Sequence, residues 1–261
     1  MARSSKIGVI YLTVFVTFLI NIFFVSNILA GSLVAYWSFD EGSGDVLKDG
    51  SGTGNDGKIN GKPKWVASNY GKAMEFDGTV FILIQNNDSY NFKKGDSFTI
   101  ALWINYQPKG DWAGPMQKFN GGYPFKVEID TANVLYFAIY DGTNFPRADI
   151  GNLNSERHQC CFVRDAKNKK LIAYLDGKLK QESADTTTGE IANAANLYIG
   201  ARTPGNTITY KGLLDEIAIY NRILTNDEIS QAANGKLPEV KGLAVDRTEK
   251  LSTTWGDIRK Y

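Results

Sequence analysis

The sequence predicts an all-β protein built as an antiparallel sandwich. From Leu33 onward, apolar and polar residues alternate with a period of two in many short runs, which is typical of strands that bury one face. Clusters of glycine, aspartate and asparagine separate these runs and mark turns. Because no helical segments separate the runs, the strands are expected to pair antiparallel with their neighbours in two packed sheets.

The N-terminal segment predicts export from the cytoplasm. Arg3 and Lys6 precede an apolar run over residues 7–25, and Ala30 supplies a small residue for cleavage, so residues 1–30 have the order of a secretory signal. The run is also close to the roughly 20 residues that span a bilayer, so an uncleaved membrane anchor at residues 7–25 is the alternative. In both cases residues 31–261 are secreted or extracytoplasmic. Only an uncleaved N-terminal segment, residues 7–25, would contact a membrane.

Composition excludes several classes of function. The chain has 261 residues, with 29 Lys and Arg against 28 Asp and Glu, so nothing suggests a nucleic-acid partner. His158 is the single histidine, and Cys160 and Cys161 are the two cysteines, which leaves too few soft ligands for zinc and no histidine relay. Adjacent strand residues point to opposite faces, so the cysteines are predicted to pack rather than to bond to each other.

The clearest strand covers residues 97–106. Phe98, Ile100, Leu102, Ile104 and Tyr106 share one face, and the residues between them share the other. The further predicted strands, in chain order, are Leu33–Phe39, Ala73–Phe76, Val80–Gln85, Pro124–Ile129, Val134–Tyr140, Cys160–Arg164, Lys170–Leu175, Asn196–Ala201 and Gly212–Tyr220. Asp-Gly pairs at residues 77–78, 141–142 and 176–177 predict tight hairpins, because both residue types tolerate positive φ.

A short helix and a tail are predicted after the last strand. Thr225 reads as a helix cap followed by acidic first-turn residues, and Gly235 ends the segment. In the tail, residues 236–261, Leu251, Trp255 and Ile258 form one apolar stripe of a possible helix. This stripe either folds back on the sandwich or docks on another extracellular protein.

Five motifs in order resemble the laminin-G-like domains of the concanavalin A-like lectin/glucanase superfamily. They are Leu33–Gly44, the loop Asp49–Gly57, the strand and turn Ala73–Gly78, the strand Phe98–Ile104 and the closing strand Leu214–Leu224. The resemblance spans about residues 33–235 and implies a jelly-roll β-sandwich domain over residues 31–235. Such domains often hold one structural Ca²⁺ near their loops.

The resemblance implies where calcium would bind in this chain. Asp49 and Asp215 are its first ligands, with Glu41 and Asn55 second, since Ca²⁺ takes carboxylate, amide and carbonyl oxygens. The alternative is that these residues form Asx turns and hydrogen bonds that hold the loop.

Glucanases of this fold carry two catalytic glutamates on one strand, in a pattern that resembles Glu-x-Asp-x-(x)-Glu. Glu128-Ile129-Asp130 begins that pattern, but Ala132 and Asn133 stand where the second glutamate is needed. We therefore expect that the protein is not an enzyme, with glycoside hydrolysis as a minor alternative. Glu128 and Asp130 are interpreted as solvated strand residues.

The predicted function is non-enzymatic binding of a polysaccharide or glycan. Trp112, Tyr123 and Tyr140 are the aromatic residues that loops or a concave sheet would present to sugar rings, and Trp112 stands in a Gly- and Asp-rich loop. The alternative is an extracellular protein-protein interaction or surface-structural domain of the same fold, acting through a sheet face or the C-terminal tail.

Overall fold

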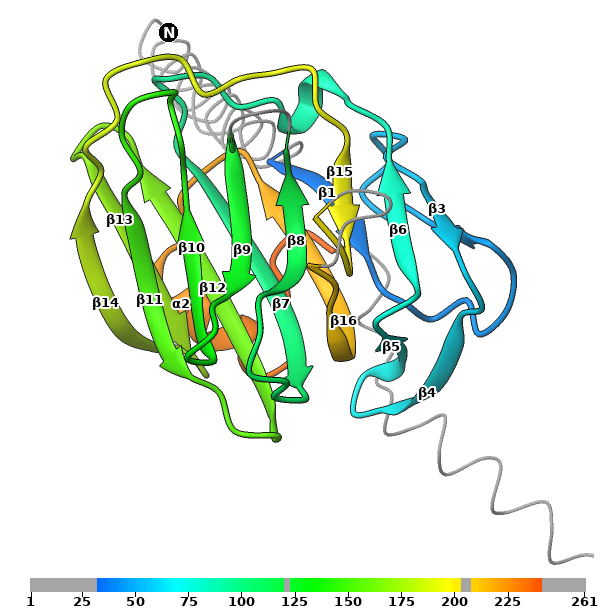
Figure 1. Ribbon diagram of the computed structural model, residues 1–261. Coiled ribbons are helices and arrows are strands. Elements are labelled where there is room, and N and C mark those ends of the chain that lie inside the picture. The colour runs from blue at the N-terminus through cyan, green and yellow to red at the C-terminus, as the bar shows by residue number, and fades with distance from the viewer. Residues whose placement is uncertain (1–31, 120–122, 203–207, 241–261) are drawn as a thin grey trace, which may run out of the picture. The chain divides into compact units, whose positions relative to one another are not determined.

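A computed structural model describes residues 32–119, 123–202 and 208–240 of the chain, and the sandwich lies within the unit Leu33–Tyr261. The predicted leader and the apolar stripe of the tail lie outside the described residues. Two antiparallel eight-stranded sheets face each other, as Figure 1 shows. The all-β jelly-roll prediction is therefore confirmed.

The first sheet, called sheet A, is ordered around its longest strands. Its order is β14 (Lys178–Ala184), β13 (Lys170–Leu175), β12 (Arg157–Asp165), β7 (Phe98–Tyr106), β16 (Lys211–Tyr220), β5 (Gly71–Asp77) and β4 (Lys64–Ser68). The start of β16 pairs with β5, and its end pairs with β1 (Leu33–Trp37). The first and last strands of the domain thus lie side by side.

The second sheet, called sheet B, lies in front in Figure 1. Its order is β11 (Arg147–Asn152), β10 (Val134–Ala138), β9 (Phe125–Ile129), β8 (Ala113–Lys118), β15 (Leu197–Ile199), β6 (Phe81–Ile84), β3 (Gly57–Asn60) and β2 (Val46–Leu47). Each sheet therefore has one face toward the other sheet and one outer face.

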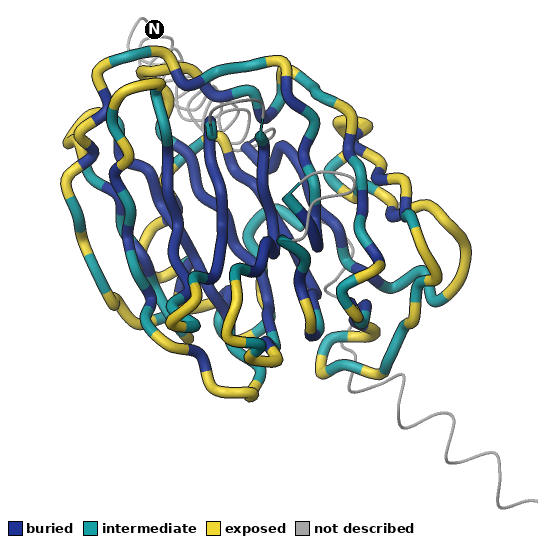
Figure 2. The backbone as a smooth tube through the Cα atoms, in the orientation of Figure 1, coloured by how far each residue is buried: buried dark blue, intermediate teal, exposed yellow. Residues whose placement is uncertain are grey.

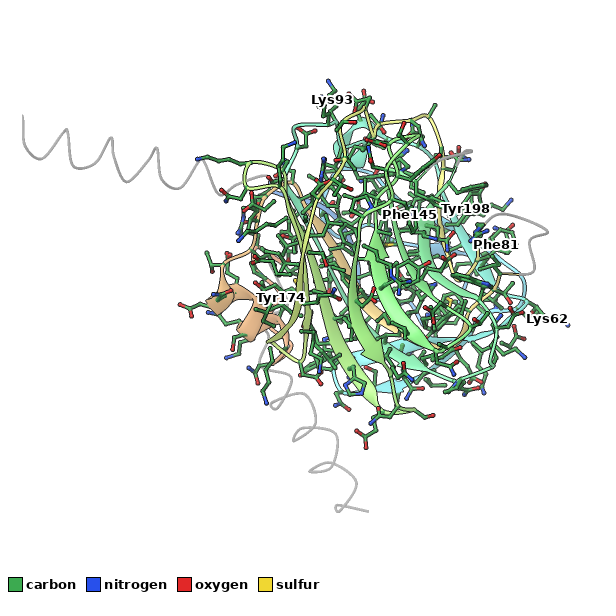
Figure 3. The ribbon with its side chains drawn as sticks, turned by 60° about the vertical axis from the view of Figure 1, so that its left-hand side comes forward. Lys62, Phe81, Lys93, Phe145, Tyr174 and Tyr198 are labelled. Carbon is green, nitrogen blue, oxygen red and sulfur yellow. The ribbon has the colours of Figure 1, made fainter. Side chains whose placement is uncertain are left out.

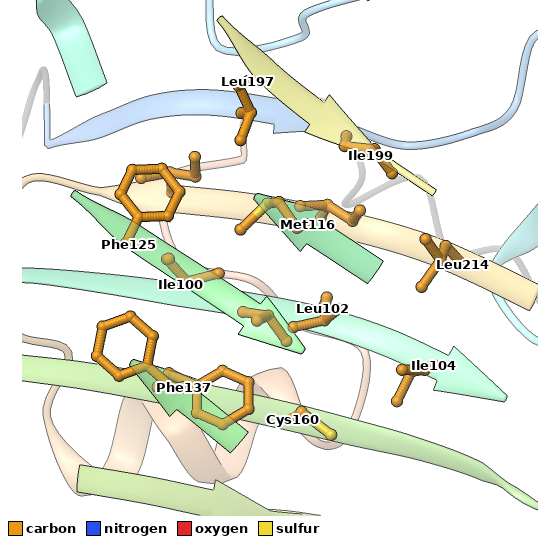
Figure 4. Packing of buried hydrophobic residues seen from close by; sticks show 14 of the residues in the cluster. Ile100, Leu102, Ile104, Met116, Phe125, Phe137, Cys160, Leu197, Ile199 and Leu214 are labelled. Atoms are coloured by element: carbon orange, nitrogen blue, oxygen red, sulfur yellow. The ribbon is translucent and has the colours of Figure 1, made fainter. Parts of the chain in front are cut away.

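The core fills the space between the sheets with apolar side chains that alternate along each strand. Ile100, Leu102 and Ile104 of β7 lie there with Phe125 and Phe137 of sheet B, as Figure 4 shows. Figure 2 shows the buried strands in the middle of the domain and exposed residues in the loops. Burial of this apolar area is the main stabilising contribution to the fold.

A second, smaller core lies on the outer face of sheet A. Helix α2 (Asn226–Ala232) packs Ile229 there, against a group that includes Cys161. Cys160 belongs to the core between the sheets, and both thiols are free. The prediction that the cysteines pack on opposite faces is confirmed. Thr225 caps α2 with a complete capping box, as its sequence predicts.

The Asp-Gly pairs have different roles. Asp176 and Gly177 both have positive φ and close the hairpin between β13 and β14, and Gly142 lies in the connection between the paired strands β10 and β11. The prediction for residues 77–78 is wrong, because they join β5 of sheet A to β6 of sheet B. Asp77 there accepts hydrogen bonds from Thr79, as in an Asx turn.

Six strands were not predicted from alternation: β2, β3, β4, β8, β11 and β14. In β8, Gly114 and Pro115 interrupt the period at a bulge between Ala113 and Met116. A short 3₁₀ helix, η1 (Asp88–Tyr90), follows β6. In the part of the chain that the structure describes, no helix is both long and apolar enough to cross a membrane.

Candidate functional site

A pair of buried charges marks the outer face of sheet B. Phe125, Val127 and Ile129 of β9 point into the core, so Lys126 and Glu128 between them point to the outer face. Even so, the exposed fraction of Glu128 is 0% and that of Lys126 is 4%. Other side chains on this face must therefore cover them.

Glu128 is surrounded by four hydrogen-bond donors. Its Oε1 atom accepts from Gln117 Nε2 and from Arg202 Nη2, both at 2.7 Å. Its Oε2 atom accepts from Lys126 Nζ and from the hydroxyl of Tyr136. We call these five residues the Glu128 cluster. They come from β8, β9, β10 and the segment after β15, so the cluster ties four parts of the sheet together.

The surroundings of Glu128 keep its carboxylate ionised. Burial alone would raise the pKa of Glu128, but the charge of Lys126 and the hydrogen bonds from Lys126, Tyr136 and Arg202 outweigh this effect and lower it. A carboxylate with all its acceptor positions engaged and a lowered pKa is a poor proton donor. The cluster is thus better suited to holding geometry than to acid catalysis.

Four aromatic rings surround the Lys126 ammonium group. Its Nζ atom lies 4.4 Å from the ring centre of Tyr123, 5.0 Å from Phe145, 5.2 Å from Tyr136 and 6.0 Å from Trp112. We call these four rings the aromatic frame. A cation over aromatic faces is attracted by the ring quadrupoles. The frame and the cluster therefore form one connected structure.

The structure brings the three predicted ligand residues near one another. Trp112 and Tyr123 both belong to the aromatic frame, and the Tyr140 ring lies 6.2 Å from that of Phe145. The Tyr140 hydroxyl donates to the carbonyl of Gly142, so it is engaged within its own loop. Phe145, labelled in Figure 3, was not predicted, and it has an exposed fraction of 43%.

Asp141 anchors the loop that carries Tyr140 and Phe145. Its carboxylate accepts backbone N–H groups from Thr143 and Asn144 within the loop. It also accepts those of Thr188 and Gly189 from the distant segment before β15. Slight burial raises the pKa of Asp141, but the four amides outweigh it and hold the pKa well below its usual value.

The residues predicted for calcium lie in two different settings. Asp49 accepts N–H groups of Tyr36 and Ser51 on Oδ1, and the Thr53 hydroxyl and Asn55 N–H on Oδ2, which are the bonds of a closed loop. This carboxylate has no acceptor position left for a metal. The alternative interpretation, in which hydrogen bonds to the carboxylate hold the loop in place, describes Asp49 well.

Asp215 stands on β16, where its partners are Ser68 of β4 and the guanidinium of Arg157 on β12. Burial raises its pKa to about 7, against the effects of Ser68 and Arg157. Glu41 Oε2 and Asn55 Oδ1 are buried oxygens without a hydrogen-bond partner among the described residues. In that part of the chain, no group of three or more His, Cys, Asp or Glu side chains is placed to hold a metal ion. The four residues do not fit a shared site in this geometry, and calcium binding stays a prediction.

The structure places the residues of the glucanase-like pattern in two different settings, a buried cluster and a turn. The interpretation of Glu128 as a solvated residue is wrong, because the cluster buries it. Asp130 accepts the N–H groups of Ala132 and Val134 in the turn after β9. Asn133 has a φ of 61° in the same turn, so the positions expected for a second glutamate lie in a turn and not on a strand.

Comparison with family models identifies the class of protein. A laminin-G-type model, described as concanavalin A-like lectin/glucanases superfamily, matches residues 76–230. The chain therefore belongs to this superfamily, as its motifs indicated. A search of curated protein sequences gave no match.

Solved structures with the same fold include binding domains of a mosquitocidal protein and of botulinum neurotoxins. The binding domain of Paraclostridial Mosquitocidal Protein 1 has a TM-score of 0.66 and 17% identity, covering 79% of this chain and 53% of that chain. A botulinum neurotoxin type C structure, for which cell entry depends on two ganglioside molecules, has a TM-score of 0.65 and 13% identity, covering 80% and 52%. The binding domain of botulinum neurotoxin DC in complex with rat synaptotagmin II has a TM-score of 0.63 and 13% identity, covering 79% and 52%. This chain spans about half the length of the solved chains it matches, and at these identities the likeness shows the fold alone.

Proposed function

We propose that the chain is a non-enzymatic module that binds a polysaccharide or glycan on the outer face of sheet B. The observation that carries the proposal is the aromatic frame, in which Trp112, Tyr123 and Phe145 stand above a fixed network of charges. Sugar rings stack their C–H faces on aromatic rings, while polar groups beside the rings read their hydroxyls. Rings that are already held in place lose little conformational entropy when a ligand binds.

The register of sheet B supports an elongated ligand. Tyr198 pairs with Gln117, Gln117 with Lys126, Lys126 with Ala138, and Ala138 with Arg147, which makes one row across five strands. Neighbouring strands lie about 4.8 Å apart, so the row is roughly 19 Å long. A second aromatic pair continues beyond Tyr198, because its ring lies 6.5 Å from that of Phe81. A carbohydrate chain lying across the strands would meet an aromatic ring at Tyr198, at one end of this row, and the aromatic frame around Lys126, in its middle.

Two further observations support binding without catalysis. Glu128 is held ionised by its four donors, and Asp130 is engaged in a turn, so neither carboxylate of the glucanase-like pattern is placed like the free acid or nucleophile of a glycosidase. Solved structures that share the fold include domains described as binding gangliosides and as complexed with SialylT. The ligands belong to those proteins, and here they support the general class of ligand.

Export is part of the proposal and rests on the sequence. The apolar run at residues 7–25 follows Arg3 and Lys6, which is the order of a signal or an anchor. Proteomic detection of an N-terminus near Gly31 in the extracellular fraction would support cleavage. Retention of residues 1–30 on a membrane-bound form would support the anchor, and recovery of the full chain from the cytoplasm would overturn export.

The test of function is a glycan and polysaccharide array probed with the purified chain, with and without Ca²⁺. Specific signal on one class of polysaccharide, lost in a variant of the aromatic frame, is the expected result. A blank array at high protein concentration would overturn the glycan proposal. It would favour the extracellular protein-interaction alternative.

A further inference from the structure

A row of buried polar side chains lies on the outer face of sheet A, on the opposite side of the domain from the proposed glycan site. Gln159 of β12 and Asp215 of β16 are both in register with Trp103 of β7 between them. The exposed fractions are 1% for Gln159, 8% for Trp103 and 1% for Asp215. Trp103 is the direct cross-strand neighbour of both Gln159 and Asp215, so its indole is within reach of each of these two side chains.

Four polar atoms in and beside this row lack hydrogen-bond partners among the described residues. Two are acceptors, Gln159 Oε1 and Asp215 Oδ1, and two carry donor hydrogens, Trp103 Nε1 and Arg157 Nη1. A buried polar atom left without a partner is costly, and folded proteins leave few of them. Four such atoms in one place, evenly divided between donors and acceptors, point to an occupant that bonds to both kinds.

The surroundings close this place off from solvent. The Arg157 guanidinium lies 4.4 Å from the ring centre of Trp103 and 5.1 Å from that of Tyr70, and the two ring centres are 5.3 Å apart, so the three groups pack against one another. Its Nη2 atom bonds to Asp215, which leaves Nη1 for another partner. The Tyr70 ring also lies directly against Gly235, where a Cβ atom would overlap it. The end of the α2 segment thus presses Tyr70 onto the row.

We propose that this row is a closed hydration site, occupied by ordered water that bridges Gln159, Trp103, Asp215 and Arg157. Water accepts two hydrogen bonds and donates two, which matches two donors and two acceptors. A metal cation does not fit, because a guanidinium and an indole N–H line the place. An anion does not fit, because the side-chain carbonyl oxygen of Gln159 and a carboxyl oxygen of Asp215 line the place. The bridging water joins β12, β7 and β16 beneath the β4–β5 hairpin.

The first test is a crystal structure of the full chain at a resolution that shows ordered water. The expected result is density bonded to at least three of the four atoms at about 2.7–3.2 Å. Density with oxygen ligands at about 2.3–2.6 Å would identify a calcium ion and overturn the proposal. Direct pairing of the four atoms with each other, with no density between them, would overturn it as well.

The second test is a double-mutant cycle with Gln159→Met and Trp103→Phe, read as melting temperatures. If water bridges the two residues, each single variant lowers Tm by a few degrees. The decrease in Tm of the double variant is then smaller than the sum of the decreases in the two single variants. The matched control is Gln159→Met combined with Phe145→Ala on the opposite sheet, whose effects should add. Additive effects of Gln159→Met and Trp103→Phe, or an unchanged Tm in both single variants, would contradict a shared occupant.

Discussion

The Nζ atom of Lys126 lies 4.4 Å from the centre of the Tyr123 ring, so a loop residue rests directly on a charge that projects from the sheet. Lys126 is in turn bonded to Glu128, which is fully buried. The position of an aromatic ring at the proposed ligand site is therefore determined by an ion pair beneath it. Both the stability of the domain and its binding of a ligand should depend on this arrangement. A substitution in an exposed ring should reduce binding, and a substitution in the buried ion pair should reduce stability.

Phe145→Ala is expected to weaken glycan binding and leave stability nearly unchanged. Phe145 is 43% exposed, so its removal uncovers little core, but it takes away one ring of the aromatic frame. We expect affinity to fall about tenfold, or about 1.4 kcal/mol. Titration calorimetry with the polysaccharide found on the array measures this change. Leu179→Ala is the matched control, because Leu179 is 58% exposed on β14 of the other sheet. Equal losses in both variants would place the ligand elsewhere.

Lys126→Met is expected to destabilise the domain strongly. It removes the ammonium group but leaves the Glu128 carboxylate buried, and breaking one partner of a buried ion pair costs about 3 kcal/mol or more. Urea unfolding measures the change. Replacing both residues, as in Lys126→Met with Glu128→Leu, removes the buried carboxylate but also leaves Arg202, Gln117 and Tyr136 without their shared acceptor, so it should recover only part of the loss. If Lys126→Met leaves the free energy of unfolding unchanged, the ion pair is not what holds this face together.

The alternation of apolar and polar residues was sufficient to predict the sandwich, because successive residues of a strand point to opposite faces of the sheet. Residues 97–106 show this alternation, and the observed strand Phe98–Tyr106 agrees within one residue, although both of its faces are buried. The edge strand β14 was missed because its residues are mostly exposed, so no apolar face marks it. The bulged strand β8 was missed because Pro115 and Gly114 interrupt its period.

The candidate site was only partly predictable, because its contacts join residues that are far apart in the sequence. Trp112 and Tyr123 are predicted from the sequence as aromatic residues that contact a ligand, and both lie next to Lys126. The prediction that Glu128 is solvated is wrong, because its partner Arg202 is 74 residues away and only the folded sheet brings the two together. Nothing near Phe145 in the sequence indicates that its ring lies over Lys126.

The loop anchor Asp141 predicts a particular dependence of stability on pH. Its pKa in the folded state is held below its usual value of 3.8, so the folded state binds fewer protons than the unfolded state at low pH. The stabilisation by this group is complete above about pH 4 and is lost as the pH falls below that value. We therefore expect Asp141→Asn to lower Tm at pH 7 and to have a smaller effect at pH 3. Asp88→Asn in η1 is the control, and an equal effect of Asp141→Asn at both pH values would contradict the anchor.

Calcium binding, predicted from the resemblance, is tested by melting the chain in CaCl₂ and in EDTA. A ligand that binds only the folded state raises Tm, so binding would appear as a higher Tm in CaCl₂. Glu41 and Asn55 keep a buried oxygen without a partner among the described residues, so Glu41→Gln and Asn55→Ala are expected to reduce that rise. Glu156→Gln, at an exposed position, should leave it unchanged. Identical melting curves in CaCl₂ and EDTA would remove calcium from the description of this domain.

The contact between Gly235 and Tyr70 predicts that Gly235 tolerates a side chain less well than Gly44, another glycine with positive φ. Gly235 has a φ of 74° and lies against the Tyr70 ring, whereas Gly44 has a φ of 93° and has no atom within 4 Å of the place where a Cβ would stand. Gly44→Ala should cost only the backbone strain, about 1–2 kcal/mol. Gly235→Ala should cost about 1–3 kcal/mol more, because the added methyl displaces Tyr70 from Arg157 and Trp103. In a Tyr70→Ala background the two glycine substitutions should cost the same, as urea unfolding would show. A persistent difference in that background would mean that something other than the Tyr70 ring restricts Gly235.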